Sequence, residues 1–343
     1  MPRPLPLLVA LALLPAAGCG GSNLEAPLTD AGGRPDLGRA EEFPVIPPGG
    51  LPDLALPGFG PPYPIVLVHG MAGFRNIGPL GYFHKIPEAM QKDGHSVWIS
   101  RSDPINDSEV RGEQVKAYVL DVLRRTGKAK AILVGHSQGG YDVSYVANRL
   151  GPRIAAVVTI ASPVKGDPIA DFIFTETGPL VQQVLAKLLE IYGAVQGFDS
   201  NAQRQVRLFT HAGSQAFFAK YPLDPNVAYY SIAGRSANAP AGGLDCWSAD
   251  TPAFIRRWDG VRDPLDPLFA IPAQVYDRMK QVPVHDGLVT AASTHLGTFL
   301  GCIPADHMDQ VNQFAGDSPG FGNSFDAVAF FRDLANWLRS RGY

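Results

Sequence analysis

Apolar residues in the first half of the chain form short continuous runs, which alternate with longer stretches whose apolar positions recur every three or four residues. The runs are typical of strands buried on both faces and lie at 64–68, 96–99, 131–134 and 154–160. The stretches with helical spacing lie at 80–92, 109–125 and 141–150. This alternation predicts an α/β fold, in which helices cover both faces of a mostly parallel central sheet.

The alternation ends near residue 162, where an insertion of about sixty residues begins. Helical spacing returns at Leu180, Val181, Val184, Leu185, Leu188 and Leu189, and again at 214–220. One interpretation of 163–225 is a helical lid over an active site, with its apolar face toward substrate. The other is a pair of helices packed in the core. The chain closes with an apolar stripe at 325–339, which predicts a packing helix.

The N-terminal segment has the pattern of an export signal. An apolar run at 5–14 is too short to span a bilayer, and Ala16-Ala17-Gly18-Cys19 follows it. Small residues before a cysteine are typical of bacterial lipoprotein processing, so 1–19 is predicted to be a signal peptide with Cys19 as the lipidated residue. Because Ala16 replaces the usual leucine, ordinary cleavage stays open. We expect an exported protein, either an outer-membrane or cell-surface lipoprotein or a secreted one.

Composition narrows the remaining possibilities. Residues 20–62 are rich in Gly and Pro and predict a tether, which leaves 63–343 as the folded domain. The net charge is -3 and the basic residues are scattered, so nothing favours nucleic acid as a partner. With Cys19 lipidated, Cys246 and Cys302 would remain as a pair, and export favours a disulfide between them. The alternative is two buried thiols.

The sequence Gly135-His136-Ser137-Gln138-Gly139 joins a predicted strand to a predicted helix and has the form G-x-S-x-G. At such a turn the serine hydroxyl stands over the edge of the sheet. The flanking glycines are required because a Cβ there would clash with the neighbouring strand and helix. Ser137 is therefore predicted to be a nucleophile. The alternative is a glycine-rich turn with an inert serine.

A nucleophilic serine needs a histidine base, and the base needs a carboxylate to orient it. On folds of this kind the order along the chain is serine, acid, histidine. Asp286, in a tight turn that we expect at the end of a strand, is the predicted acid, and His307 is the predicted base. His295 is the alternative base. The backbone N–H groups of Gln138 and Met71 are the predicted donors of an oxyanion hole.

Together these stretches resemble the secreted bacterial triacylglycerol lipases of the Pseudomonas and Burkholderia type, which are α/β-hydrolases. The matching segments are 63–74, the serine turn, 162–166, 170–172, 219–222, 286–289, 295–297 and 307–313. The resemblance implies the same triad of Ser137, Asp286 and His307. It also implies an acyl-enzyme mechanism on water-insoluble acylglycerols at an oil–water interface.

The resemblance further implies a structural Ca²⁺ that steadies the loop carrying the base. Its ligands would be Asp309 and Asp263, with Asp266 as the competitor, and backbone oxygens near Gln313 and Asp317. Many relatives need a membrane foldase, which makes a foldase a possible partner. The chain departs from the family at 290–293, where the family's cysteine is absent, so a bridge between the two late cysteines would be placed differently.

Other functions remain open on the same residues. An esterase, a phospholipase or a polyester depolymerase would use the same triad on a different ester. A non-catalytic lipid-binding surface protein would keep the scaffold without turnover. Anchoring to a membrane through Cys19 is compatible with each of these functions.

Overall fold

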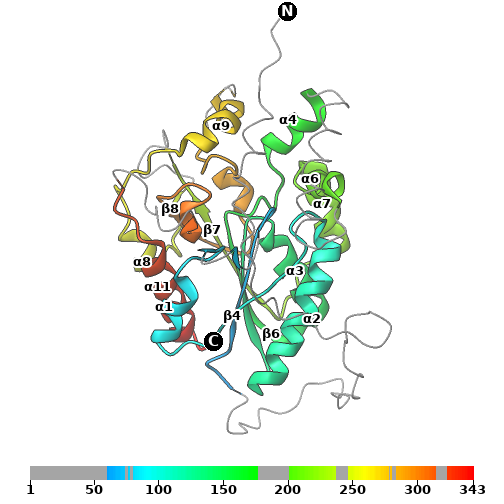
Figure 1. Ribbon diagram of the computed structural model, residues 1–343, viewed down its shortest axis with the longest axis vertical. Coiled ribbons are helices and arrows are strands. Elements are labelled where there is room, and N and C mark those ends of the chain that lie inside the picture. The colour runs from blue at the N-terminus through cyan, green and yellow to red at the C-terminus, as the bar shows by residue number, and fades with distance from the viewer. Residues whose placement is uncertain are drawn as a thin grey trace, which may run out of the picture.

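Six parallel strands form the central sheet, in the order β4-β1-β5-β6-β7-β8 (Figure 1). The strands are β1 (Ile65–Val68), β4 (Val97–Ile99), β5 (Ala131–His136), β6 (Ile154–Ile160), β7 (Ala228–Gly234) and β8 (Thr298–Ile303). The computed structural model describes residues 60–73, 76–77, 80–176, 201–236, 246–277, 279, 283–313 and 323–343. The predicted parallel sheet is confirmed, because every pair of neighbouring strands runs parallel.

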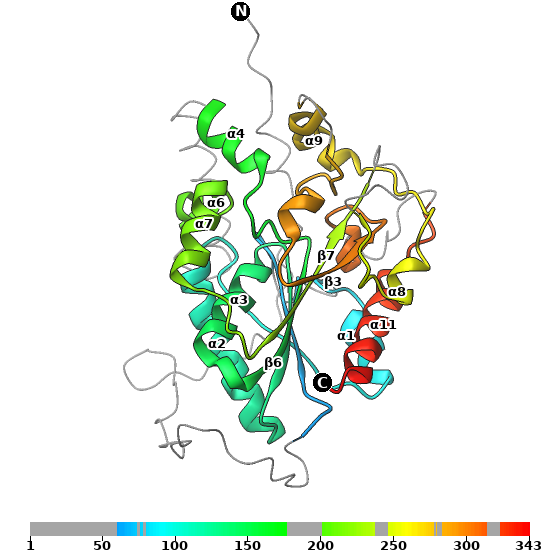
Figure 2. The same ribbon diagram turned by 180° about the vertical axis from the view of Figure 1, so that it is seen from behind.

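Helices cover both faces of the sheet, as predicted. Helices α2 (Ser108–Thr126) and α3 (Gly139–Leu150) lie on one face, and α1 (Ile86–Lys92), α8 (Ala253–Arg256) and α11 (Ala327–Ser340) lie on the other (Figures 1 and 2). Alternate residues of β1 face the two layers: Ile65 and Leu67 pack in the core beneath α11, and Val66 and Val68 pack in the core beneath α2. This two-sided burial explains why the strands are continuous apolar runs.

The predicted amphipathic helices form where their apolar stripes require. The side chain of Asp107 caps α2 by accepting hydrogen bonds from the amides of Glu109 and Val110, and Gly127 ends the helix in the left-handed conformation. In α11 the side chain of Asp326 caps the first turn. The buried stripe of this helix contains Phe330, Phe331, Leu334, Ala335 and Leu338, which makes it the packing helix expected at 325–339.

The structure departs from the sequence prediction at the start of one helix and in two strands that the sequence did not predict. The helix expected at 80–92 begins only at Ile86, because Lys85 has a φ of 60° and Pro87 fits only the first helical turn. Before it, β3 (Leu80–Gly81) pairs antiparallel with β2 (Asn76–Ile77). Strands β7 and β8 were not predicted, because residues such as Ser231 and Gly301 interrupt their apolar runs.

The insertion at 163–225 contains three described helices: α4 (Pro168–Glu176), α6 (Ala202–Leu208) and α7 (His211–Lys220). Helix α7 agrees with the helical spacing at 214–220, and it packs on α3 through Phe217 and Tyr141, whose ring centroids lie 5.3 Å apart. Helix α4 lies at the same end of the molecule as α9 (Ala270–Asp277) (Figure 1). The apolar stretch 180–189 lies outside the described residues, so the lid remains a prediction.

The remaining short elements are 3-10 turns at Gly151–Arg153, Pro267–Phe269, Ala291–Thr294 and Asp309–Val311. A disulfide joins Cys246 to Cys302 of β8, with a Cα–Cα distance of 4.9 Å, so the expected pair is present. Within the described ranges, no helix has the length and apolar character needed to cross a membrane. The signal segment with Cys19 and all but the last residues of the tether lie outside those ranges.

Candidate active site

Ser137 stands at the turn between β5 and α3, which we call the serine elbow (residues 135–140). Its φ of 54° is positive, a conformation that is costly for any residue with a side chain and that occurs mostly at functional sites. The Ser137 amide donates to the Ile160 carbonyl of β6 at 2.9 Å, which fixes the turn to the neighbouring strand. The predicted nucleophile therefore has the backbone geometry that its motif requires.

The glycines of the serine elbow are required by close packing. A Cβ at Gly135 would lie 2.2 Å from the Gly139 carbonyl oxygen, and a Cβ at Gly139 would lie 2.4 Å from the Val68 carbonyl oxygen. Neither distance is tolerated between real atoms. This confirms the steric interpretation of the motif, with β1 as the strand that α3 approaches.

His307 and Asp286 form a buried pair beside the serine elbow. The His307 Nδ1–H donates to Asp286 Oδ2 at 2.8 Å, and Gln310 Nε2 donates to the same oxygen at 2.8 Å. The His307 amide also donates to the Asp286 carbonyl at 3.0 Å. Burial by itself raises the pKa of Asp286, but these donors hold the pKa below its ordinary value, so the carboxylate stays ionised.

The sequence predicted that Asp286 would lie at the end of a strand, and the structure places it differently. It lies in a tight turn at 284–291, which we call the acid turn, and an isolated bridge between His285 and Thr290 closes that turn. The amides of Leu288 and Val289 donate to Asp286 Oδ1. The acid turn reaches the sheet at the end of β7, where a Cβ at Gly234 would lie 2.8 Å from the Asp286 Cβ.

The other histidines near the site have packing roles. The His136 ring lies between Tyr82, whose hydroxyl is 2.7 Å from His136 Nδ1, and His307, whose ring centroid is 4.7 Å away. Burial lowers the pKa of His136 well below its ordinary value, so this ring is neutral. His295, the alternative base, stacks on Phe299 of β8 with a ring-centroid distance of 3.9 Å, whereas His307 bonds the Asp286 carboxylate.

The loop after β1 runs against the nucleophile, where the oxyanion hole was predicted. A Cβ at Gly70 would lie 2.6 Å from the Ser137 Cβ and 3.1 Å from its Oγ. In the described part of the chain, no backbone carbonyl accepts a hydrogen bond from the Met71 or Gln138 amides. The Gln138 side chain faces away from the serine, since its Nε2 donates to the Asn106 carbonyl at 2.7 Å.

Arg111 holds this loop from beneath, a role that the sequence reasoning missed. Its side chain is fully buried and donates to the carbonyls of His69 at 2.7 Å and Gly70 at 3.3 Å. It also forms a buried ion pair of 2.7 Å with Asp142 of α3. The available signal was its register: Arg111 lies four residues before Val115, on the apolar stripe of α2.

His69 is neutral and shapes the same loop. Burial, reinforced by the Arg111 charge, lowers the pKa of His69 to about 3. Its Nδ1–H donates to the Gly70 carbonyl at 2.9 Å, and its Nε2 accepts from the Ser102 amide at 3.3 Å. This agrees with the local loop-shaping role expected of a histidine at a strand end.

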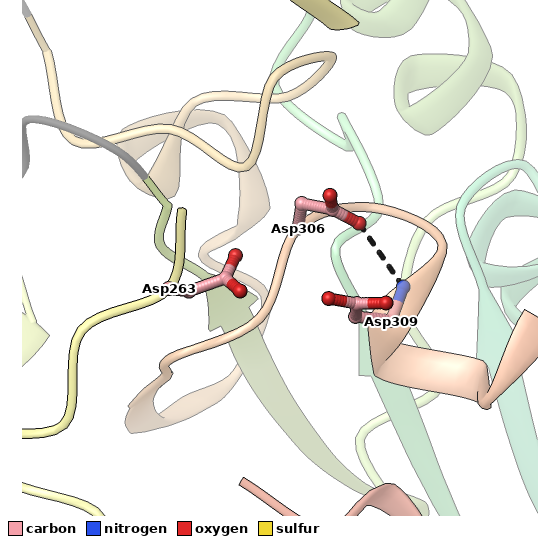
Figure 3. A group of neighbouring side chains, drawn as sticks. All are labelled: Asp263, Asp306 and Asp309. Atoms are coloured by element: carbon pink, nitrogen blue, oxygen red, sulfur yellow. Dashed lines mark hydrogen bonds between the residues drawn. The ribbon is translucent and has the colours of Figure 1, made fainter. Parts of the chain in front are cut away.

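Three buried carboxylates gather beside the histidine loop (residues 304–313). Asp263, Asp306 and Asp309 point toward one another, and one ligand atom from each lies within 4.8 Å of the others (Figure 3). Asp263 Oδ2 is buried and has no hydrogen-bond partner among the residues that the structure describes. Burial, with Asp306 nearby, raises the pKa of Asp263 to about 7. A divalent cation that prefers oxygen ligands fits such a donor set, because it would neutralise the crowded charge.

The acidic group, which consists of Asp263, Asp306 and Asp309, agrees in part with the cation ligands that the sequence predicted. Asp263 and Asp309 come together as predicted, and Asp306 is a third member that the prediction missed. Its carboxylate accepts from the amides of Met308, Asp309 and Asp266. The competitor Asp266 thus lends its backbone N–H to the group. Gln313 is buried, with its Nε2 unpartnered, and Asp317 lies outside the described residues.

Comparison with known proteins agrees with this geometry. The family described as the alpha/beta hydrolase fold matches residues 63–249. A triacylglycerol lipase of Vibrio cholerae is 31% identical over 290 residues, covering 82% of this chain and 88% of the relative. One of Pseudomonas fragi is 30% identical over 306 residues, covering 82% and 97%. One of Burkholderia plantarii is 29% identical over 316 residues, covering 82% and 87%.

Solved structures support the fold alone. A metagenomic carboxyl esterase superposes with a TM-score of 0.56 at 19% identity, covering 81% of this chain and 76% of its own. EstA from Clostridium botulinum superposes with a TM-score of 0.54 at 17% identity, covering 82% and 88%. The chain therefore belongs to the α/β-hydrolase family and, within it, to the bacterial triacylglycerol lipases.

Proposed function

We propose that Ser137, His307 and Asp286 carry out ester hydrolysis in this lipase. The observation that carries the proposal is the hydrogen-bonded pair of His307 and Asp286, packed against the residue that precedes a positive-φ serine. His307 Nε2 takes the proton as Ser137 Oγ attacks the ester carbonyl, and then returns it to the leaving alcohol. Water, activated by the same base, releases the fatty acid from the acyl-enzyme.

The charge that develops on the carbonyl oxygen needs preorganised donors. We assign this role to the amides of Met71 and Gln138. Gln138 follows the serine, Met71 follows the Gly70 that packs on it, and neither amide has a backbone acceptor in the described residues. Arg111 and His69 support the assignment, since they bond the carbonyls of the loop and so hold it in place.

The proposed substrate is a water-insoluble triacylglycerol at an oil–water interface. The relatives from Vibrio cholerae and Pseudomonas fragi, each covering 82% of this chain, are named triacylglycerol lipases, and the apolar spacing at 180–189 suits a lid that opens onto lipid. The test measures the initial rate against tributyrin concentration through its solubility limit. We expect a jump once emulsion forms, whereas smooth saturation below the limit would identify an esterase.

Ser137→Ala is the control for this measurement. It removes the nucleophile and leaves Cβ in place, so we expect a native circular dichroism spectrum and a loss in kcat of about 10⁶-fold. A variant that kept more than a few per cent of wild-type turnover would contradict the assignment of the triad.

We further propose that the acidic group binds Ca²⁺. Asp263, Asp306 and Asp309 would hold the ion, together with backbone oxygens near Gln313 and Asp317. The bound ion would neutralise the buried carboxylates and fix the histidine loop, and it would take no part in the chemistry itself. The unpartnered oxygen of Asp263 and the shared burial of the three side chains support this site.

Export and anchoring are also proposals. Residues 1–19 would direct export, Cys19 would carry lipid and 20–62 would tether the enzyme to a membrane. The disulfide supports export, because disulfides persist in oxidising compartments. Lipidation is tested by growth with labelled palmitate. The wild type should incorporate the label and Cys19→Ser should not, and equal labelling of the two would refute lipidation at Cys19.

The need for a foldase is tested by refolding the chain alone. Full recovery of activity would contradict a foldase partner.

A further inference from the structure

A buried carboxylate outside the triad lies between the insertion and the acid turn. Asp167 ends the loop after β6 and immediately precedes α4, and only 3% of its surface is exposed. The Asp167 amide donates to the Phe209 carbonyl, between α6 and α7, at 2.8 Å. Its backbone therefore belongs to the insertion, and its side chain reaches both the first turn of α4 and the acid turn.

Four donors converge on the Asp167 carboxylate. Tyr276 Oη of α9 and the Ile169 amide of α4 donate to Oδ1, at 2.7 and 3.0 Å. The Thr290 amide and Ser293 Oγ donate to Oδ2, at 2.9 and 3.0 Å. One oxygen thus holds two helices at the rim of the site, and the other holds the segment that follows Asp286. An acceptor of this capacity must be a carboxylate.

The hydrogen bond from the Thr290 amide to Asp167 holds the acid turn where its two ends come together. Thr290 forms the isolated bridge with His285, and the Ala291 amide donates to the Val284 carbonyl at 2.7 Å. Asp286 lies at the tip of this closed turn. The His285 ring in turn packs on Tyr276, with a centroid distance of 4.6 Å. Both sides of the acid turn are therefore tied to groups that Asp167 binds.

We propose that Asp167 is a positioning residue for ester hydrolysis, whose carboxylate fixes the acid turn, and through it Asp286, relative to helices α4 and α9. The inference rests on the proposed role of Asp286 as the triad acid. Its consequence is that any movement of α4 at the start of the insertion is transmitted to the carboxylate that orients the base. A displacement of about 1 Å in such a group costs up to ~100-fold in rate.

The test compares Asp167→Asn with Asp171→Asn, measured on dissolved p-nitrophenyl butyrate so that interfacial effects are absent. Asparagine keeps the shape of the side chain but has a single acceptor oxygen, so one pair of donors loses its partner. Asp171 lies on α4, the helix that Asp167 precedes, and pairs with His211 of α7, which makes it the matched control.

We expect Asp167→Asn to lower kcat by about 10- to 100-fold with KM unchanged. The low-field proton resonance of the His307–Asp286 hydrogen bond should also shift or disappear. Asp171→Asn should change neither. If Asp167→Asn keeps wild-type kcat and the resonance while its melting temperature falls, Asp167 is merely structural and the proposal is overturned.

Two further variants keep the outcome decisive. Should Asp167→Asn fail to fold, Ser293→Ala removes a single donor and should give a smaller loss in kcat with the same change in resonance. A wild-type kcat and resonance in Ser293→Ala would then overturn the proposal. Asp286→Asn tests the proposed triad separately from the role of Asp167. If Asp286→Asn retains wild-type kcat, the proposed triad fails. If Asp286→Asn lowers kcat and Asp167→Asn does not, only the role of Asp167 fails.

Discussion

The serine elbow and the histidine loop meet at the same edge of the sheet, yet they are held in place by different means. The serine elbow is fixed by contacts within the chain. These are glycines that leave no room for a Cβ, a hydrogen bond from the Ser137 amide to β6, and the buried ion pair of Arg111 and Asp142 nearby. The histidine loop brings Asp306 and Asp309 beside Asp263, and a bound cation would relieve the repulsion among these three buried carboxylates.

This difference indicates two kinds of preorganisation in one site. The serine elbow and the loop after β1 are set once the core has packed, because each constraint on them is steric or is paired inside the protein. If the acidic group holds the proposed Ca²⁺, the position of His307 depends also on that ion, and removing the ion should loosen the histidine loop without unfolding the sheet. Perturbing each half separately should therefore give distinct results.

The largest effect should come from breaking the ion pair on the serine side. Arg111→Met leaves Asp142 buried and unpaired, and we expect a loss of about 3–5 kcal/mol in the free energy of unfolding, measured by urea denaturation. The same substitution frees the carbonyls of His69 and Gly70. The kcat of the Arg111→Met protein that does fold should also fall, because the loop that carries the Met71 amide loses its support.

A double variant separates charge burial from loop support. Arg111→Met combined with Asp142→Leu removes both charges, so much of the lost stability should return. The kcat on soluble ester should stay low, since no guanidinium holds the loop. Recovery of both stability and kcat would show that Arg111 serves only to compensate Asp142.

On the histidine side, the expected effect is smaller and depends on the cation. Removing Ca²⁺ with a chelator should lower the melting temperature, because an ion at 100 times its Kd stabilises the folded state by about 2.7 kcal/mol. Asp309→Ala should abolish this response, whereas Asp250→Ala, at an exposed acid, should keep it. A wild-type melting temperature that ignores the chelator would count against the site.

The sequence predicted the parts of this molecule that depend on local patterns. Strands β5 and β6 consist mostly of apolar residues, and the serine elbow contains a five-residue motif (135–139) whose glycines are required by close packing. The residues it missed act through contacts that only the fold creates. Asp306 meets Asp263 across 43 residues, and Asp167 meets Thr290 across 123. The structural role of Arg111 could have been predicted, because a charged residue on the apolar stripe of a helix needs a buried partner.

The effect that is smallest at neutral pH concerns the protonation of His69 on the serine side. The pKa of buried His69 is lowered to about 3, against 6.5 when exposed, so between these values the unfolded chain binds the extra proton. Stability should therefore fall as pH drops from about 6.5 toward 3, by up to ~1.4 kcal/mol per pH unit. His69→Gln, which cannot titrate, should reduce this slope in denaturant titrations across that range, and the part that remains would come from other groups such as the buried His136. Ser102→Ala, which removes a neighbour of the ring but keeps the histidine, should leave the slope in place. Because no carboxylate of the acidic group takes part, the difference between His69→Gln and wild type should be the same with and without Ca²⁺. A difference that changed with the ion would mean that the two halves of the site are not independent.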